Sequence, residues 1–409
     1  MVVGGGIVGI ACAHYLVEAG LRVVVIDQGK IGGACSQGNC GYICPSHIPP
    51  LTEPGAFKVA LKSLLNRRSP FRVKPTVNPS LIYWMMQFAL RCNSRQVLCA
   101  GSHLQTILDS SMAEYRSLLA REHFSCEWED KGLLYVFRSE HAANDFAEID
   151  RLLTDHFGVA AVRIQGKDLP AFDPGLREGL YGGFHYPHDA SVRPDRLNQS
   201  WMESLKDKGV RFLEGCVFEE PIGEGGALKK LKTSQGILEG DAFVFAMGAL
   251  SGTWSSKLGT RIPVQPGKGY SITLPRPPRC PRHPILFPEE KVGVSPFARG
   301  MRLGSMMEFV GYDSTIPEYR TEQLRSAARR YLVASVDAPA EETWFGWRPM
   351  TWDSLPIIGP LPQWRNAYLA TGHNMIGLTL APATGRLIAE LVTGQVPHID
   401  VSPYALSRF

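Results

Sequence analysis

The stretch Val2-Val3-Gly4-Gly5-Gly6-Ile7-Val8-Gly9-Ile10 decides how the N-terminal region folds. An apolar start leads into glycines and then into apolar residues at helical spacing, which predicts a strand, a tight turn and a helix. Gly4, Gly6 and Gly9 stand in the G-x-G-x-x-G order of a dinucleotide-binding turn. The first glycine allows the tight turn, the second allows the close approach of a pyrophosphate, and the third allows the helix to pack on the strand. The helix N-terminus then presents unpaired N–H groups to the phosphates.

A second apolar run, Val23 to Ile26, ends at Asp27, about 20 residues past the glycines. A carboxylate at this place is expected to accept a hydrogen bond from a ribose hydroxyl, which argues against the phosphorylated ribose of NADP. The residues up to Asp27 therefore predict a dinucleotide site, and by themselves they leave FAD and NAD open.

The whole chain has the composition of an ordinary globular protein. Its 409 residues are enough for about two or three domains, and 44% of them are hydrophobic and 20% charged. The net charge of +4 is small, so nucleic acid is not favoured as a partner. Nine scattered cysteines without a paired zinc pattern predict reduced thiols and no metal site. No signal-peptide pattern or membrane-spanning apolar run is visible, so we expect a cytoplasmic protein.

Later elements predict a discontinuous fold. The apolar run from Ala242 to Met247 is typical of a buried parallel strand, and residues 263–308 have the short apolar runs of a sheet. Near the end we expect a strand, a glycine turn and a helix that Pro382 opens. The predicted class is α/β. A Rossmann-like dinucleotide domain takes residues 1–50, 185–261 and 345–409, and an α+β substrate domain on a mostly antiparallel sheet takes 51–184 and 262–344.

One region has an unusual charge pattern. The stretch from Lys58 to Lys74 carries six cations and no acid, and the segment from Leu81 to Leu90 is apolar nearly all round. One interpretation is a buried helix behind a solvated basic loop. The other is a surface that contacts a membrane, because cations beside an apolar segment too short to span are what interfacial binding uses.

Four separated stretches together resemble the D-amino acid oxidase family of FAD-dependent amine oxidoreductases, most closely its branch of bacterial D-amino acid dehydrogenases. They are the first stretch up to Asp27, the loop from Gly38 to Pro45, the run Gly346-Trp347-Arg348-Pro349-Met350-Thr351, and the turn and helix start from Ala370 to Gly385. Lys268-Gly269-Tyr270-Ser271 is similar to the dehydrogenase branch in particular. The likeness spans nearly the whole chain in the family's order.

The resemblance implies an extended, noncovalent FAD, because no Cys or His stands where covalent relatives attach the ring. Asp27 stands where the family more often has glutamate. The implied cofactor contacts fall at five places along the chain: Gly4, Gly6, Ile7, Val8 and Gly9; Asp27, Gln28 and Val217; Ser36, Asn39, Gly41, Tyr42 and Ile43; Ala246, Gly248, Trp254 and Gly346; and Gly372, His373, Asn374, Met375, Gly377, Leu378 and Thr379.

The resemblance also implies oxidative deamination of D-amino acids to 2-oxo acids and ammonia, with hydride moving to the flavin and electrons passing to a quinone or another non-oxygen acceptor. Arg348 is the expected anchor, since a guanidinium holds a carboxylate bidentately. Tyr270 is a candidate second donor, and His373 either a proton relay or a packing residue. His47, Met307 and Tyr312 are candidate pocket residues.

Several alternatives stay open. One is an oxygen-using oxidase of the glycine, sarcosine or D-proline type, and another is a flavin-carrying subunit of a hetero-oligomeric dehydrogenase. Peripheral contact with the inner face of the cytoplasmic membrane is a further hypothesis, whereas the oligomeric state is not predicted.

Overall fold

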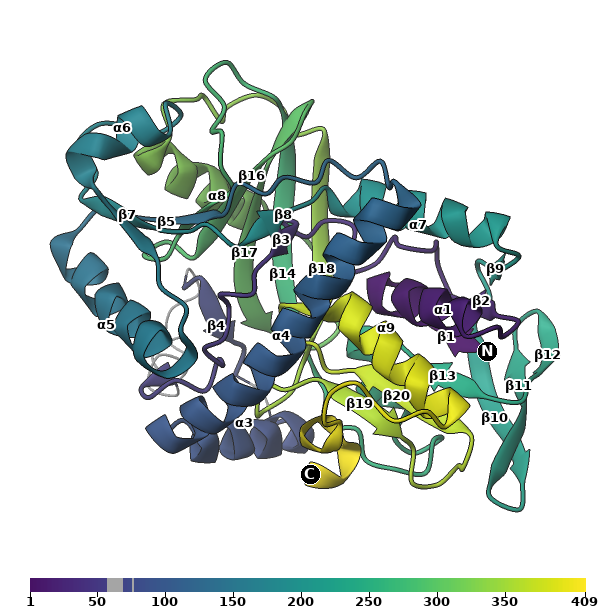
Figure 1. Ribbon diagram of the computed structural model, residues 1–409. Coiled ribbons are helices and arrows are strands. Elements are labelled where there is room, and N and C mark those ends of the chain that lie inside the picture. The colour runs from purple at the N-terminus through teal and green to yellow at the C-terminus, as the bar shows by residue number, and fades with distance from the viewer. Residues whose placement is uncertain (57–68, 76) are drawn as a thin grey trace.

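A six-stranded, mostly parallel sheet forms one part of the molecule (Figure 1). Its strand order is β19-β20-β13-β1-β2-β9, and β19 at the edge is antiparallel to β20. Strands from three distant parts of the chain are therefore neighbours, so the predicted discontinuous dinucleotide-binding fold is confirmed. The strands are β1 (Val2–Val3), β2 (Val24–Ile26), β9 (Arg211–Leu213), β13 (Phe243–Phe245), β19 (Ile357–Pro360) and β20 (Ala367–Thr371). This computed structural model describes residues 1–56, 69–75 and 77–409.

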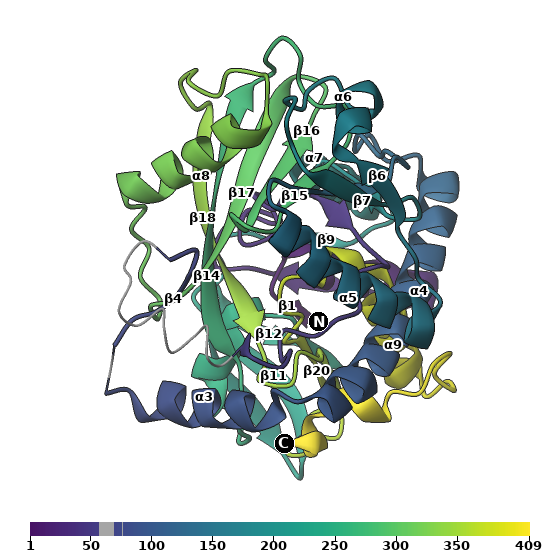
Figure 2. The ribbon, with the colours of Figure 1, turned by 90° about the vertical axis from the view of Figure 1, so that its left-hand side faces the viewer.

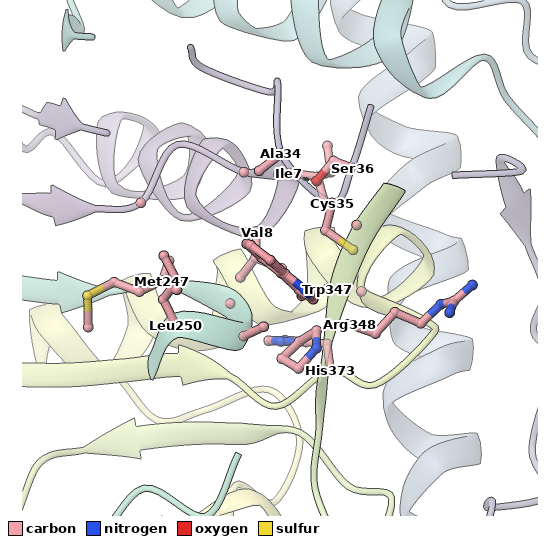
Figure 3. Close-up of a pocket in the computed structure, with 18 of the residues that line it drawn as sticks. Ile7, Val8, Ala34, Cys35, Ser36, Met247, Leu250, Trp347, Arg348 and His373 are labelled. Carbon is pink, nitrogen blue, oxygen red and sulfur yellow. Dashed lines mark hydrogen bonds between the residues drawn. The ribbon is translucent and has the colours of Figure 1, made fainter. Parts of the chain in front are cut away.

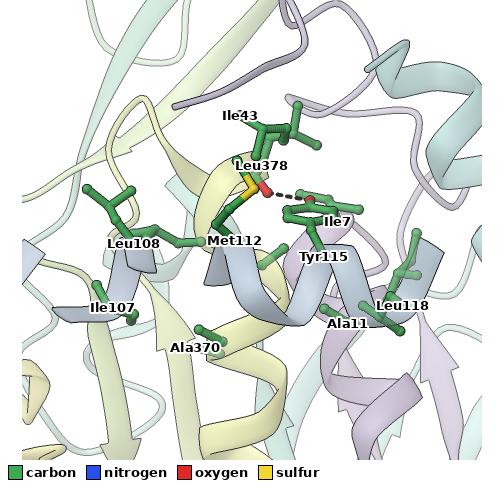
Figure 4. Packing of buried hydrophobic residues seen from close by; sticks show 14 of the residues in the cluster. Ile7, Ala11, Ile43, Ile107, Leu108, Met112, Tyr115, Leu118, Ala370 and Leu378 are labelled. Carbon is green, nitrogen blue, oxygen red and sulfur yellow. Dashed lines mark hydrogen bonds between the residues drawn. The ribbon is translucent and has the colours of Figure 1, made fainter. Parts of the chain in front are cut away.

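Helices α1 (Ile7–Glu18) and α9 (Gly377–Thr393) pack together on this sheet, and α4 (Ser94–Glu122) lies over α9 (Figures 1 and 2). The α1 and α9 backbones approach closely, because a Cβ at Gly385 would lie 2.6 Å from the carbonyl oxygen of Ala11. Apolar side chains of α1, α4 and α9 share one core, in which Leu108 and Leu118 are fully buried (Figure 4). α7 (Pro194–Asp207) packs beside α1.

A nine-stranded, mostly antiparallel sheet forms the second part, in the order β18-β14-β17-β16-β15-β5-β7-β6, with β4 also paired to β17. α8 packs on it (Figure 2). Its elements are β4 (Phe71–Val73), β5 (Leu133–Phe137), β6 (Val162–Gln165), β7 (Gly182–Tyr186), β14 (Gln265–Pro275), β15 (Ile285–Phe287), β16 (Val292–Pro296), β17 (Gly300–Phe309), β18 (Glu342–Met350) and α8 (Glu318–Tyr331).

Smaller elements complete the described chain. β3 (Tyr42–Ile43) pairs with β8 (Ala190–Ser191), and β10 (Phe218–Glu224), β11 (Ala227–Thr233) and β12 (Gly236–Glu239) form a separate sheet. The other helices are α3 (Pro79–Arg91), α5 (Glu140–Phe157), α6 (Leu169–Phe172), η1 (Gly166–Asp168), η2 (Gly248–Trp254), η3 (Ser402–Tyr404) and η4 (Leu406–Arg408).

The structure differs from the predicted domain boundaries at two places. α4 falls within the predicted substrate segment 51–184, yet it packs on α9 because its apolar stripe is buried there. The predicted divisions after residues 184 and 344 fall inside β7 and β18, and both strands pair along their whole length within the nine-stranded sheet. We therefore assign α4 to the dinucleotide-binding part and all of β18 to the nine-stranded sheet.

The start of the last helix differs from prediction too. α9 begins at Gly377, and Pro382 lies inside it rather than at its first turn. A proline inside a helix removes one N–H donor and normally breaks the helix. Here the carbonyl group of Leu378, four residues before Pro382, accepts a hydrogen bond from Tyr115 of α4 instead, and the helix continues.

The predicted basic and apolar region is described in part. Lys58, Lys62, Arg67 and Arg68 lie outside the described residues. α3 buries Leu81, Trp84 and Phe88 against β4, β17 and β18, so it is a partly buried helix. Its other face exposes Ile82, Tyr83, Met86 and Leu90. Among the helices that the structure describes, none is long and apolar enough to cross a membrane.

Candidate cofactor and substrate site

A cavity of about 510 Å³ lies between the turn after β1, η2, the edge strand β18 and the turn before α9 (Figure 3). Met247 and Leu250 lie toward one end of the labelled residues and Arg348 toward the other. Most of the predicted cofactor contacts line it: Gly4, Gly6, Ile7, Val8, Asp27, Gln28, Ser36, Asn39, Ala246, Gly248, Trp254, Gly346, His373, Asn374, Met375, Gly377 and Leu378.

The three motif glycines have different surroundings. Gly4 has φ +105°, and a Cβ there would overlap the carbonyl group of Ala246. A Cβ at Gly9 would overlap the carbonyl oxygen of Gly4. By contrast, a Cβ at Gly6 would meet one neighbouring atom, Oγ of Ser36, at an ordinary 3.6 Å. Packing within the protein therefore requires Gly4 and Gly9, whereas Gly6 keeps open a space that belongs to the cavity.

Polar groups surround that space. The Ile7 N–H, at the start of α1, donates to Oγ of Ser36 at 3.1 Å, so this loop residue is fixed above the helix N-terminus. Asp27 accepts hydrogen bonds from the N–H groups of Gly5 at 2.7 Å and Gly29 at 2.8 Å. Its carboxylate lines the cavity and has lone pairs left for a further donor.

The loop after β2 turns away from the cavity beyond Asn39. Gly41, Tyr42 and Ile43 do not line the cavity, because Tyr42 and Ile43 pair with β8. The Tyr42 hydroxyl donates to the carbonyl oxygen of Ile285 at 2.8 Å, which ties the loop to the nine-stranded sheet. Val217 is also outside the cavity lining, whereas its neighbours Cys216 and Phe218 lie within it, since side chains alternate there.

The turn before α9 is fixed by Asn374, which has φ +50°. Its N–H donates to the carbonyl oxygen of Pro349 at 3.0 Å, and its side chain bonds Thr351 and Gly372. Gly372 and Thr379 support this turn from outside the cavity lining. The Asn374 contacts bring the start of α9 against β18, so two segments from distant parts of the chain border the same cavity.

His373 lines the cavity and is buried, with Nε2 2.9 Å from Oγ1 of Thr384. Burial lowers the pKa of its imidazole from 6.5 to about 3. A group with such a pKa is neutral at physiological pH and is a weak base. This environment does not favour a role for His373 as a proton relay. It fits a residue that packs and hydrogen-bonds beside the cavity.

Arg348 lies in the part of the cavity away from Met247 and extends past Cys35 (Figure 3). Its Nη1 donates to the carbonyl oxygen of Met306 at 2.7 Å, and no Asp or Glu among the described residues forms an ion pair with it. Burial lowers the pKa of this guanidinium from its ordinary value, yet an arginine stays protonated in proteins. A partly buried cation without a carboxylate partner among the described residues is suited to bind an anion.

The Tyr270 prediction is corrected by its side-chain position. Gly269, its neighbour on β14, faces the guanidinium of Arg348, so alternation along the strand turns Tyr270 to the opposite face of the sheet. Its hydroxyl there donates to the buried carboxylate of Glu308, and the side chain is 2% exposed and does not line the cavity.

The three predicted pocket residues also lie outside the cavity lining. Met307 is buried in the apolar cluster with Trp84 and Trp352. The Tyr312 hydroxyl donates to the carbonyl oxygen of Ala249 at 2.8 Å, and its ring packs against Trp347. Tyr312 therefore contacts two residues of the cavity wall without lining the cavity itself. The N–H of His47 donates to Cys44, and burial lowers the pKa of its imidazole.

Sequence reasoning missed the aromatic part of the wall. Trp344 and Phe345 line the cavity, with Trp347, because β18 is an edge strand and exposes both of its faces to the space beside it. The signal in the sequence was the aromatic run Trp344-Phe345-Gly346-Trp347 immediately before Arg348. Cys35, on the loop after β2, lines the cavity as well.

Comparison with known proteins identifies the family. Residues 1–391 match the family described as FAD dependent oxidoreductase. The chain belongs to this family of FAD-dependent oxidoreductases. FAD is therefore its cofactor, and the cavity is the site whose residues fit it. In this site Gly6 would leave room for the pyrophosphate, the first turn of α1 would supply N–H groups, and the Asp27 carboxylate could accept from the ribose.

The relatives of this FAD-dependent oxidoreductase match nearly its whole length. The chain is 30% identical to a D-amino acid dehydrogenase of Agrobacterium fabrum, over 100% of this chain and 99% of the relative. It is 32% identical to a D-amino acid dehydrogenase of Vibrio cholerae, over 97% of this chain and 96% of the relative. A crystal structure of glycine oxidase from Geobacillus kaustophilus has a TM-score of 0.78 and 20% identity, covering 100% of this chain and 98% of the other. This last likeness shows a shared fold.

Proposed function

We propose that the protein catalyses the oxidative deamination of D-amino acids to 2-oxo acids and ammonia, with electrons leaving to a quinone or another non-oxygen acceptor. The observation that carries the proposal is the partly buried guanidinium of Arg348, which borders the cavity and has no carboxylate partner among the described residues. The relatives named D-amino acid dehydrogenase support the choice of substrate.

The residues of the cavity serve positioning more than acid–base chemistry. Bound FAD supplies the hydride acceptor for the Cα–H of the substrate. Arg348 is suited to hold the carboxylate by two parallel N–H bonds, which fixes the orientation of Cα. Among the described residues that line the cavity, the one carboxylate is Asp27, which the first turn holds through Gly5 and Gly29. Burial lowers the pKa of His373 to about 3, which makes it a weak base, so we expect the substrate amine to lose its proton to solvent before or on binding.

An anaerobic panel tests this proposal. The purified holoprotein is mixed under nitrogen with D-amino acids, L-amino acids, D-proline, sarcosine and glycine, and bleaching of the flavin band is followed. Preferential bleaching by D-amino acids supports the proposal, and preferential bleaching by glycine or sarcosine contradicts it. Slow peroxide formation in air is expected with a non-oxygen acceptor, and bleaching by the single chain contradicts the subunit alternative.

We also propose that the exposed face of α3 contacts the anionic surface of a membrane. Ile82, Tyr83, Met86 and Leu90 are 48%, 38%, 59% and 71% exposed on this helix, whose other face is anchored in the core. The sequence from Pro54 to Leu108 contains eight Lys and Arg residues and no acid. Among them, Arg95 and Lys74 are exposed near the helix. Apolar side chains flanked by cations suit an anionic bilayer, where a quinone would be accessible.

A further inference from the structure

The strand β14 provides space for the guanidinium of Arg348. Gly269 pairs with Gly346 of β18 in the antiparallel ladder, and Arg348 lies two residues further along that strand. A Cβ at residue 269 would lie 2.5 Å from both Cζ and Nη2 of Arg348, and it would overlap Nη1. The guanidinium therefore occupies the volume that a side chain at 269 would take.

Backbone conformation does not explain this glycine. Gly269 is not among the residues with positive φ, so an L-residue could adopt its backbone. The strand is also buried, and Gly269 pairs with Gly346 of β18, a place where glycine is unfavourable because it adds no packing. The contact with Arg348 supplies the missing reason: glycine is needed because another group comes close.

Met306 holds the guanidinium from another direction. Its carbonyl oxygen accepts the Nη1 bond at 2.7 Å, and its φ of +68° is uncommon for a residue with a side chain. The residue lies where the register between β14 and β17 shifts, between the Lys268–Glu308 and Tyr270–Ser305 pairs. The bulge turns this carbonyl toward Arg348 instead of leaving it in the ladder.

We propose that Gly269 is a positioning residue for substrate binding, which acts by leaving space for the guanidinium of Arg348 beside the Met306 carbonyl. This inference rests on the proposed role of Arg348 as the carboxylate anchor. Any side chain at 269 would push the guanidinium out of this position and weaken its hydrogen bonds to the substrate carboxylate, while FAD would still bind.

A double-mutant cycle with Gly269→Ala and Arg348→Met tests the proposal. For the best D-amino acid of the panel, Gly269→Ala should raise KM at least about tenfold and change kcat less than about threefold. In the Arg348→Met background the same change should alter KM by less than about twofold, because the group that the methyl displaces is gone. The flavin absorbance of each holoprotein reports that the cofactor remains bound.

Gly267→Ala is the matched control on the same strand. A Cβ there would lie 2.5 Å from Sδ of Met307 and 2.7 Å from Cγ of Met350, which are flexible side chains that can move. Its KM should stay within about twofold of the wild type. If Gly267→Ala raised KM as much as Gly269→Ala, the effect would come from the sheet in general and the proposal would be wrong.

The outcomes separate the two proposals. If Arg348→Met does not weaken D-amino acid binding, the anchor role fails, and the Gly269 inference fails with it. If Arg348→Met weakens binding but Gly269→Ala has a wild-type KM, or has its full effect in the double variant, the anchor stands and the Gly269 inference is overturned. Should Gly269→Ala not fold, the double variant must restore soluble, yellow protein, and its failure to do so would also overturn the inference.

Discussion

The hydroxyl of Tyr115, on α4, donates a 2.6 Å hydrogen bond to the carbonyl oxygen of Leu378 in the first turn of α9 (Figure 4). Leu378 lies four residues before Pro382, which has no N–H to offer it. Ser111, one turn earlier on α4, bonds the next carbonyl, that of Thr379, at 2.6 Å and accepts from the Ala383 N–H at 3.4 Å. Side chains of α4 thus supply hydrogen bonds to the backbone of α9 around Pro382, beside the cofactor cavity.

Replacing Tyr115 with Phe should destabilise the protein, because the buried Leu378 carbonyl would lose its donor. We expect the free energy of unfolding to fall by about 1–3 kcal/mol, measured by denaturant titration of the apoprotein. Pro382→Ala restores a helical N–H, so in that background the loss from Tyr115→Phe should shrink to below about 1 kcal/mol. Equal losses in both backgrounds would contradict this explanation.

Gly6→Val should abolish FAD binding and leave the apoprotein folded. The backbone of Gly6, with φ −71°, accepts a side chain, and the added atoms would enter the cavity space meant for the pyrophosphate. Gly9→Ala is the contrasting variant, since its methyl overlaps the Gly4 carbonyl and should impair folding itself. Circular dichroism and flavin absorbance distinguish the two. A yellow Gly6→Val protein would contradict the assignment.

The noncovalent attachment of FAD can be tested with the wild-type holoprotein. Acid precipitation of the wild-type holoprotein should release the yellow colour into the supernatant. Colour that remained with the pellet would show a covalent flavin.

Replacing Arg348 should lower the efficiency of flavin reduction without lowering FAD content. The lost interaction is of a kind worth about 1.5–3 kcal/mol per bond to a charged group, so kcat/KM should fall at least tenfold in Arg348→Met and less in Arg348→Lys, which keeps the charge but not the fork. In wild type, amines that lack the carboxylate should have a lower kcat/KM than the matching amino acids. In Arg348→Met this difference should disappear. An unchanged preference for amino acids would show that the carboxylate is held elsewhere.

The buried His373 predicts a particular pH dependence. Its folded-state pKa of about 3 lies below the ordinary 6.5, so the unfolded chain binds the extra proton and stability falls as pH drops through the range from 6.5 to 3. Relative to His373→Gln, the wild type should lose about 2 kcal/mol of unfolding free energy between pH 7.5 and 5.0. For flavin reduction, the rate should rise with pH as the substrate amine loses its proton, without an inflection due to His373. An inflection near neutrality that His373→Gln removes would restore the proton relay.

Membrane contact by α3 should depend on both its apolar face and salt. The wild type should cosediment with anionic vesicles, and less so in high salt, because exposed charges are screened over about 8 Å at physiological ionic strength. Met86→Glu and Leu90→Glu should abolish cosedimentation. Ile237→Glu, at a 59% exposed apolar position on β12, is the matched control and should still bind. No binding of the wild type at low salt would disprove the membrane proposal.

The sequence by itself determined the dinucleotide-binding turn and its cofactor region. Local rules suffice there: Gly4 must adopt a positive φ, the helix must begin beside it, and Asp27 must end the next strand. Arg348 was singled out from the sequence by its Gly-Trp-Arg-Pro setting, whereas the aromatic residues just before it were missed, although they lie in the same strand.

Tertiary structure alone decided which face of β14 lies beside Arg348. The sequence pattern Lys268-Gly269-Tyr270 offers a tyrosine hydroxyl as an attractive donor, but strand alternation and the pairing with β18 put Gly269 beside Arg348 and turn Tyr270 to Glu308. The continuation of α9 through Pro382 depends on Tyr115 and Ser111, which lie more than 260 residues away in the chain. Such contacts join distant segments through packing, and no local pattern encodes them.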